Sequence, residues 1–113
     1  MDLGLKDKVV VVTGGGSGIG LATALEFARE GAKVAICGRN SQKLEEAKAV
    51  FAQEGLTVFA GICDVTVSRA VADFVAEVTA TVGPIHVWVN NAGSNQVYLG
   101  ALCIRARTDK QIK

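Results

Sequence analysis

VVVVTGGGSGIG, residues 9–20, is a run of four valines followed by a glycine-rich turn. A short run of β-branched residues predicts a strand buried on both faces. The glycines predict a tight turn, because glycine adopts positive φ without steric cost. After the turn, Leu21, Leu25 and Ala28 repeat at helical spacing. The segment therefore predicts a strand, a turn and a helix.

The alternation of strand and helix continues along the chain. We expect strands at residues 8–12, 33–37, 57–61 and 85–89, and helices from 21 to the stop at Gly31, over 41–54, and over the apolar stripe from Val71 to Val82. Parallel strands need a crossover long enough to hold a helix, so this alternation implies parallel pairing. We predict an α/β fold: a doubly wound, Rossmann-like parallel sheet, truncated after about four strands in the order 3-2-1-4.

Composition indicates a folded domain and excludes several classes of function. Half of the 113 residues are hydrophobic and 20% are charged, which excludes a disordered tail. The net charge of +1 lacks the basic footprint of a nucleic-acid-binding protein, and no apolar run suits a signal peptide or a membrane span. Cys37, Cys63 and Cys103 are widely spaced and indicate neither a disulfide framework nor a zinc site. We expect a cytoplasmic protein.

The glycine-rich turn has the spacing Gly14-x-x-x-Gly18-x-Gly20. Between a strand and a helix, such a turn lets backbone N–H groups and the positive end of the helix dipole approach a pyrophosphate closely. The spacing differs from the generic GxGxxG dinucleotide fingerprint. The alternative is a turn that only packs the helix against the strand.

Three motifs occur in order: TGGGSGIG at 13–20, CDV at 63–65 and NNAG at 90–93. Together they resemble the short-chain dehydrogenase/reductase family. The resemblance covers residues 6 to about 100, which corresponds to the amino-terminal, cofactor-binding half of a family member. It implies an oxidoreductase that transfers a hydride between a nicotinamide cofactor and a carbonyl or alcohol substrate.

The resemblance also implies which residues bind the cofactor. The pyrophosphate would be lined by Gly14, Ser17, Gly18, Ile19 and Gly20; the adenine would be held by Asp64 and Val65; the ribose and nicotinamide side would be supported by Asn90, Ala92 and Gly93. For Asp64, the alternative is an aspartate that caps the following helix.

Charge at the end of the second expected strand predicts which coenzyme binds. The strand ends in Cys37-Gly38-Arg39-Asn40, with glycine where NAD-preferring members of the family carry an acid. An acid there would bind the ribose 2′-hydroxyl of NAD and repel a 2′-phosphate, whereas a guanidinium can bind a phosphate. We therefore place Arg39 and Asn40 in the site and predict NADP over NAD. In the alternative, Arg39 stacks on the adenine or points into solvent and discriminates weakly.

The family's catalytic serine and Tyr-x-x-x-Lys lie on elements after NNAG. Tyr98, the single tyrosine, follows NNAG too closely to be that residue, and Leu102 stands where the lysine would be. We therefore expect no catalytic residue here. The alternative functions are a nucleotide-binding module without hydride chemistry and a non-functional truncation. We interpret His86 and Trp88, in the fourth expected strand, as structural.

The composition changes after residue 93. Residues 1–93 carry eight basic and ten acidic side chains, whereas residues 94–113 carry four and one. We interpret 1–93 as a dinucleotide-binding half-domain and 94–113 as an atypical tail. The fourth strand would be an open apolar edge that allows self-association, unless the tail pairs with it. The expected partner is a nicotinamide dinucleotide, with no nucleic acid and no membrane.

Overall fold

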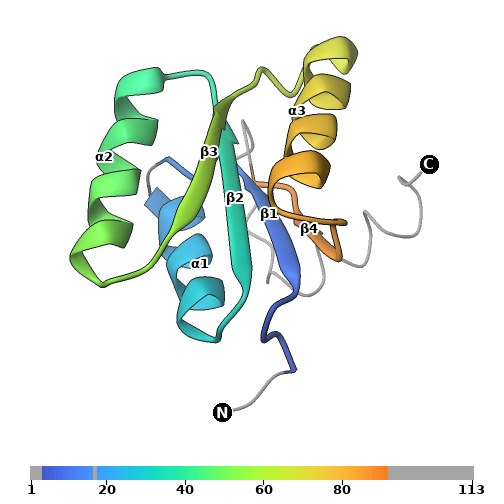
Figure 1. The fold of residues 1–113 in the computed structure, drawn as a ribbon. Helices are drawn as coiled ribbons and strands as arrows, with labels where there is room; N and C mark the ends of the chain where they lie inside the picture. The colour runs from blue at the N-terminus through green and yellow to red at the C-terminus, as the bar shows by residue number, and fades with distance from the viewer. Residues whose placement is uncertain (1–3, 17, 92–113) are drawn as a thin grey trace.

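The computed structural model describes residues 4–16 and 18–91. Strands and helices alternate along this part of the chain (Figure 1). The elements are β1 (Val9–Thr13), α1 (Gly18–Arg29), β2 (Lys33–Gly38), α2 (Ser41–Gln53), β3 (Val58–Ile62), α3 (Ser68–Thr81) and β4 (Val87–Val89). In this part of the chain, no helix is long and apolar enough to cross a membrane.

The four strands form one parallel sheet in the order β3-β2-β1-β4. β1 lies in the middle, with Val9 opposite Lys33 of β2 and Val10 opposite Val87 of β4. All five residues of β1 are buried, because helices cover both faces of the sheet. The predicted doubly wound α/β fold and its strand order are confirmed.

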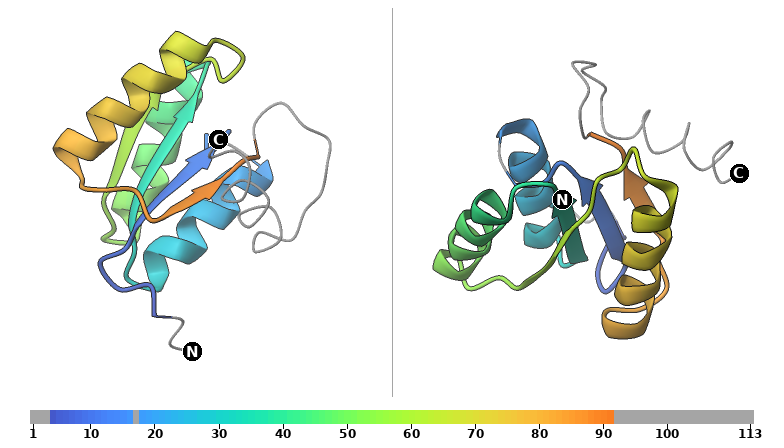
Figure 2. Two further views of the ribbon diagram at one scale, coloured as in Figure 1. Left: turned by 90° about the vertical axis from the view of Figure 1, so that its right-hand side faces the viewer. Right: turned by 90° about the horizontal axis from the view of Figure 1, so that it is seen from above.

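Helices α1 and α2 pack on one face of the sheet and α3 on the other (Figure 2). Successive strand side chains point to opposite faces, so each strand contributes to two hydrophobic cores. The first core joins Val10, Val12, Val34 and Ile36 to Leu25, Leu44 and Phe51 of the helices, and the second joins Val9, Val11 and Ala35 to Phe74 and Val78. The helical stripes seen in the sequence are therefore the faces that cover the sheet.

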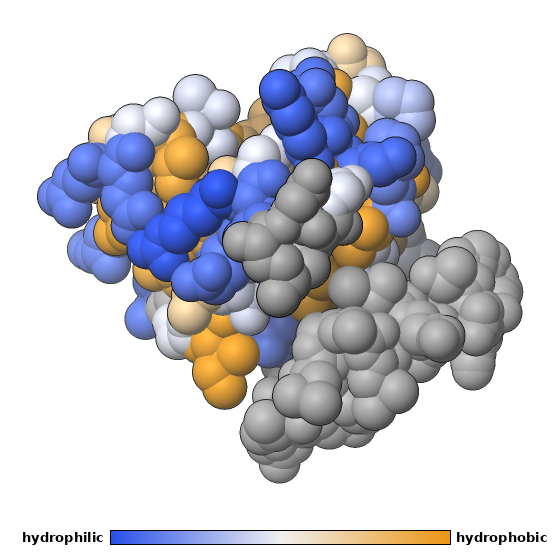
Figure 3. Space-filling view, turned by 90° about the horizontal axis from the view of Figure 1, so that it is seen from below, coloured by the Kyte–Doolittle hydropathy of each residue, from blue (hydrophilic) through white to orange (hydrophobic). Residues whose placement is uncertain are grey.

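The end of the molecule where the strands begin is mostly polar. Figure 3 shows this end, with hydrophilic side chains over much of it and smaller apolar patches between them. At the end of α1, Arg29 pairs with Glu26 at 2.8 Å and with Glu54 at 2.7 Å. The hydrogen bonds from Arg29 lower the pKa of the Glu54 carboxyl. Exposed pairs of this kind add little stability, but they link the ends of α1 and α2.

β4 is shorter than the expected strand at 85–89, because it begins only at Val87. Just before it, the His86 N–H donates to the Val9 carbonyl at 2.9 Å, and the ring Nδ1 accepts the Val9 N–H at 3.0 Å. A side chain therefore takes the place of a backbone acceptor where β1 begins. The structural interpretation of His86 is confirmed, and Trp88 packs against the second core. The expected length of this edge strand is wrong, because three residues form it and not five.

Replacing His86 tests the bond to Val9. In His86→Ala the Val9 N–H loses its acceptor, so we expect a loss of about 1 kcal/mol in the free energy of unfolding, measured by urea denaturation. His86→Asn is the matched control, because its side-chain oxygen can accept the same N–H. An alanine variant as stable as the parent chain would show that the ring carries no structural role.

Candidate functional site

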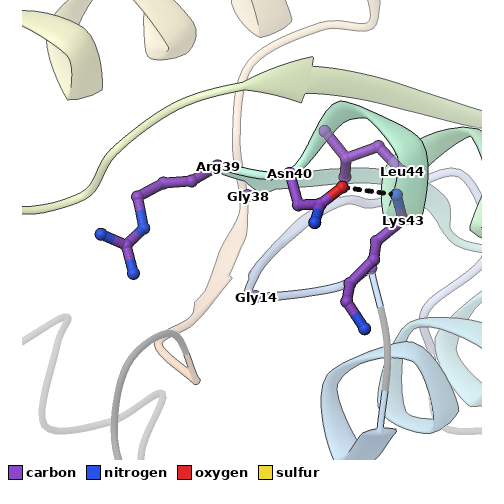
Figure 4. Close-up of a pocket in the computed structure, with 7 residues that line it drawn as sticks. Gly14, Gly38, Arg39, Asn40, Lys43 and Leu44 are labelled. Atoms are coloured by element: carbon purple, nitrogen blue, oxygen red, sulfur yellow. Dashed lines mark hydrogen bonds between the residues drawn. The ribbon is translucent and has the colours of Figure 1, made fainter.

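A cleft of about 650 Å³ lies at the carboxyl end of the sheet, beside the ends of β1 and β2 (Figure 4). It is lined by Gly14 and Gly16 of the β1–α1 turn, Gly38, Arg39 and Asn40 after β2, and Lys43 and Leu44 of α2. Ligands of open parallel sheets bind outside the carboxyl ends of the strands, and the volume is that of a small-molecule site. The cleft is therefore the candidate site.

The glycine-rich turn uses two of its own N–H groups to hold itself against β2. The N–H groups of Gly14 and Gly15 both donate to the Cys37 carbonyl, at 2.9 and 3.3 Å. Gly14 has φ 68° and Gly18 has φ 60°, values that favour glycine. A Cβ at Gly18 would meet no described atom within 4 Å, apart from its chain neighbours and the nearby backbone of α1. The first N–H groups of a helix have no acceptor within the helix, and the described residues leave space at the Cβ position of Gly18, the first residue of α1.

Gly20 lies underneath the turn. A Cβ there would overlap the Gly14 carbonyl oxygen and lie 2.7 Å from Nδ2 of Asn91. The first turn of α1 therefore packs directly on the backbone of the glycine-rich turn and on the segment after β4. Ile19, beside it, is an exposed large apolar side chain.

Thr13 joins the ends of β1 and β4. Its buried hydroxyl accepts the Asn91 N–H at 2.8 Å and lies 3.2 Å from Oδ1 of Asn90. The sequence reasoning selected Asn90 but missed Asn91, although both belong to the NNAG motif. The other predicted site residues Ser17, Ala92 and Gly93, and the tail at 94–113, lie outside the described residues.

Asp64 follows β3 and is oriented by Thr66. Its Oδ1 accepts the Thr66 N–H at 2.9 Å and the Thr66 hydroxyl at 2.6 Å. These bonds, and to a smaller extent the charge of Arg39, lower the pKa of the Asp64 carboxyl. The N-cap of α3 is Val67, so the alternative that Asp64 caps this helix is wrong. Val65 packs against the second core.

Arg39, Asn40 and Lys43 are the charged and amide side chains that line the cleft. Oδ1 of Asn40 accepts the Lys43 N–H at 3.0 Å and caps α2. The Arg39 side chain is exposed and close enough to Asp64 to affect its pKa. Lys43 was missed in the sequence. The available signal was its place in the first turn of the helix that follows Arg39.

Two buried thiols lie beneath this end of the sheet. Cys37 ends the buried part of β2, and Cys63 follows β3. Burial raises the pKa of the Cys37 thiol to about 12 and also raises that of Cys63. Both therefore stay protonated near neutral pH and are poor nucleophiles. In the described ranges, no group of three or more His, Cys, Asp or Glu residues could hold a metal ion.

Comparisons with known proteins agree with the motifs. A family model described as short chain dehydrogenase matches residues 8–111. Over 83 residues the chain is 45% identical to a gluconate 5-dehydrogenase from Gluconobacter oxydans, covering 74% of this chain and 32% of the relative.

Solved structures are also similar. A short chain dehydrogenase from Mycobacterium smegmatis superposes with a TM-score of 0.76 at 40% identity, over 81% of this chain and 39% of its own. An L-sorbose reductase from Gluconobacter frateurii, complexed with NADPH and L-sorbose, gives a TM-score of 0.77 at 37% identity, over 88% of this chain and 38% of its own. The chain thus spans well under half the length of these relatives.

Two glycines of the turn differ in what an added methyl group would meet. Gly20→Ala forces a Cβ into the Gly14 carbonyl, so we expect a loss of about 3 kcal/mol or more in the free energy of unfolding. Gly16→Ala is the control: its Cβ would lie 3.4 Å from the Cβ of Lys43, an ordinary contact, and should change stability by less than about 0.5 kcal/mol. Chemical denaturation measures both, and equal losses would contradict this packing.

Thr66→Val tests how Asp64 is held. Because the variant lacks the hydroxyl donor, we expect the pKa of Asp64 to rise toward its ordinary value, as followed by carbon-13 NMR of the carboxyl carbon. The pKa of Asp64 is lower in the folded chain than in the unfolded chain. The stabilisation from its ionised carboxylate is therefore fully present above the unfolded-state pKa, and it is lost as the pH falls through the folded-state pKa. The stability difference from the parent chain should therefore shrink in acid. Thr79→Val, on the exposed side of α3, is the control; an unchanged Asp64 pKa in Thr66→Val would refute the assignment.

Proposed function

Because this chain belongs to the short-chain dehydrogenase family, we propose that it is the NADP(H)-binding portion of an oxidoreductase. The reaction is hydride transfer between the nicotinamide and a carbonyl or alcohol substrate. One observation carries the choice of coenzyme: the cleft has Gly38 and Arg39 at the end of β2, and none of the described residues that line it is acidic. An acid is the group that would repel a 2′-phosphate, and a guanidinium is the group that would bind it.

The residues present fit an extended dinucleotide. Gly14, Gly16 and Gly38 bring backbone without side chains to the cleft, and the start of α1 at Gly18 is open. A helix start with free N–H groups suits a pyrophosphate. The exposed Arg39 side chain is close enough for its charge to act on Asp64, and a planar guanidinium can stack on an adenine as well as bind a phosphate.

The adenine end has an oriented acceptor. Thr66 holds Oδ1 of Asp64, and Oδ2 makes no hydrogen bond recorded for the described residues. A carboxylate oxygen such as Oδ2 can accept a hydrogen bond from an amino group, and adenine carries one. We therefore assign the adenine to Asp64 and Val65, in keeping with the family resemblance.

The other parts of the coenzyme are assigned to the predicted residues at the carboxyl end of the sheet. We assign the pyrophosphate to Gly14, Ser17, Gly18, Ile19 and Gly20, the ribose 2′-phosphate side to Arg39 and Asn40, and the ribose and nicotinamide side to Asn90, Ala92 and Gly93. Gly14 and Gly20 contribute by shaping the turn, since their positions fix its backbone. Residues 1–93 form the proposed dinucleotide-binding half-domain.

The coenzyme, when bound, supplies or accepts the hydride. The described residues bind and orient it, and we assign none of them a proton-transfer step. The structural relative from Gluconobacter frateurii is complexed with NADPH, which supports the phosphorylated coenzyme for this chain.

Gly38→Asp tests the preference for NADP(H). A Cβ at Gly38 would meet only Cδ2 of Leu44, at 3.8 Å, so the cleft has room for the new side chain. We expect the carboxylate to lower NADPH affinity at least about tenfold and to raise NADH affinity, as measured by calorimetric titration of each coenzyme.

Gly38→Ala is the matched control and should keep the parent preference. If the parent chain binds neither coenzyme, or binds NADH more tightly than NADPH, the proposed function is wrong. If Gly38→Asp leaves both affinities unchanged, the end of β2 does not contact the ribose.

A further inference from the structure

Lys43 is the second cation of the cleft. It lies on the first turn of α2 and lines the same cleft as Arg39, although the two residues are on different elements. A Cβ built on Gly16 would lie 3.4 Å from the Cβ of Lys43 and 3.6 Å from its carbonyl carbon. The backbone of α2 at this position is therefore packed directly against the glycine-rich turn.

The two cationic side chains extend in different directions from the residues that line the cleft. In Figure 4 the Arg39 side chain extends to one side of Gly38 and the Lys43 side chain to the other, with Gly14 between them in this view. Neither takes part in any of the ion pairs found among the described residues, which involve Arg29, Lys48 and Arg69. Among the described residues, the lining of the cleft therefore carries two positive charges and no acid.

Two cations facing an open cleft match a dianion better than a single charge. A phosphate monoester carries about −1.5 to −2 charges near neutral pH and has three acceptor oxygens. A guanidinium binds such a group through its planar pair of donors, and an ammonium on a flexible four-carbon stem reaches it as a point charge. A ribose with two hydroxyl groups has no charge for the second cation to pair with.

We propose that Lys43 is a direct ligand of the 2′-phosphate of NADP(H) and that it determines coenzyme preference together with Arg39. This inference rests on the proposed function and adds a residue of α2 to the same cleft. Arg39 approaches the phosphate from the adenine side, and Lys43 approaches it from the side of the glycine-rich turn. The phosphate is then held between two elements, β2 and α2, which Asn40 connects rigidly by capping α2.

The test separates the 2′-phosphate from the rest of the coenzyme. The affinities of the 113-residue chain and of Lys43→Gln are measured by calorimetric titration with NADPH, NADH, 2′,5′-ADP and 5′-AMP. We expect Lys43→Gln to bind NADPH and 2′,5′-ADP about tenfold more weakly, as for the loss of one charge-assisted hydrogen bond. The affinities for NADH and 5′-AMP should change less than about twofold, since neither carries the phosphate.

Two further variants are measured beside Lys43→Gln as controls. Lys48→Gln removes a charge from the same helix at an exposed position where the lysine pairs with Glu45, and it should leave all four affinities unchanged. Lys43→Arg keeps the charge and should retain most of the preference for NADPH. Thermal melts without ligand check that each variant is as stable as the parent, as expected for an exposed side chain.

The outcomes distinguish this inference from the proposed function. If the parent chain prefers NADPH, and Lys43→Gln keeps the same NADPH to NADH affinity ratio, the role of Lys43 is wrong and the proposed function stands. The same conclusion follows if Lys43→Gln weakens NADPH and NADH equally, because the lysine then does not recognise the 2′-phosphate. A parent chain without any preference for NADPH would overturn both.

Discussion

The contact between the first turn of α1 and the backbone of Gly14 is the constraint on which the site depends. At position 20 there is no room for a side chain, since a Cβ would meet the Gly14 carbonyl and the Asn91 amide. The same short turn is bonded to the end of β2 through the Cys37 carbonyl. β1 is joined to the segment after β4 through Thr13. The absence of a side chain at Gly20 therefore lets α1 begin directly against the turn, and the cleft lies beside this turn and the end of β2.

Charge then determines what the cleft can select. The carboxyl end of the sheet carries Arg39 and Lys43 on the lining of the cleft. Asp64, whose pKa the charge of Arg39 helps to lower, is bonded by Thr66 through one of its two oxygens. The buried thiols of Cys37 and Cys63 stay protonated, so they add no negative charge below the cleft. The electrostatic environment is therefore that of an anion site with one oriented acceptor at its edge.

The sequence predicted the fold well, because the fold depends on local patterns. The run of valines at β1, the apolar stripes of the helices and the glycine stops all act within a few residues, and parallel strands joined by helices permit few arrangements. The start of β4 was predicted less well. His86 replaces a backbone acceptor with its ring, which periodicity does not reveal. The role of Asp64 before α3 also had two interpretations, because an aspartate near the start of a helix can bond either to the helix or to the preceding turn.

The candidate site residues came from two sources in the sequence: the motifs, and the charge at the end of β2, which selected Arg39 and Asn40. Gly14, Gly20 and Asp64 were found by resemblance, and their environments in the structure give physical reasons for those residue types. Asn91 and Lys43 were missed because their roles depend on a neighbour distant in sequence: Asn91 contacts Gly20, and Lys43 lies against Gly16. Contacts of this kind follow from how the strands and helices pack, which one sequence does not specify.

The central claim is that the carboxyl end of this sheet binds a 2′-phosphorylated adenine nucleotide, and titrating the nitrogen-15-labelled chain with 2′,5′-ADP tests it most directly. The account predicts saturable amide shifts at residues 14–16, 38–40 and 43, with little change where β2 and β3 begin; no saturable shifts, or the largest shifts at that opposite end, would contradict it.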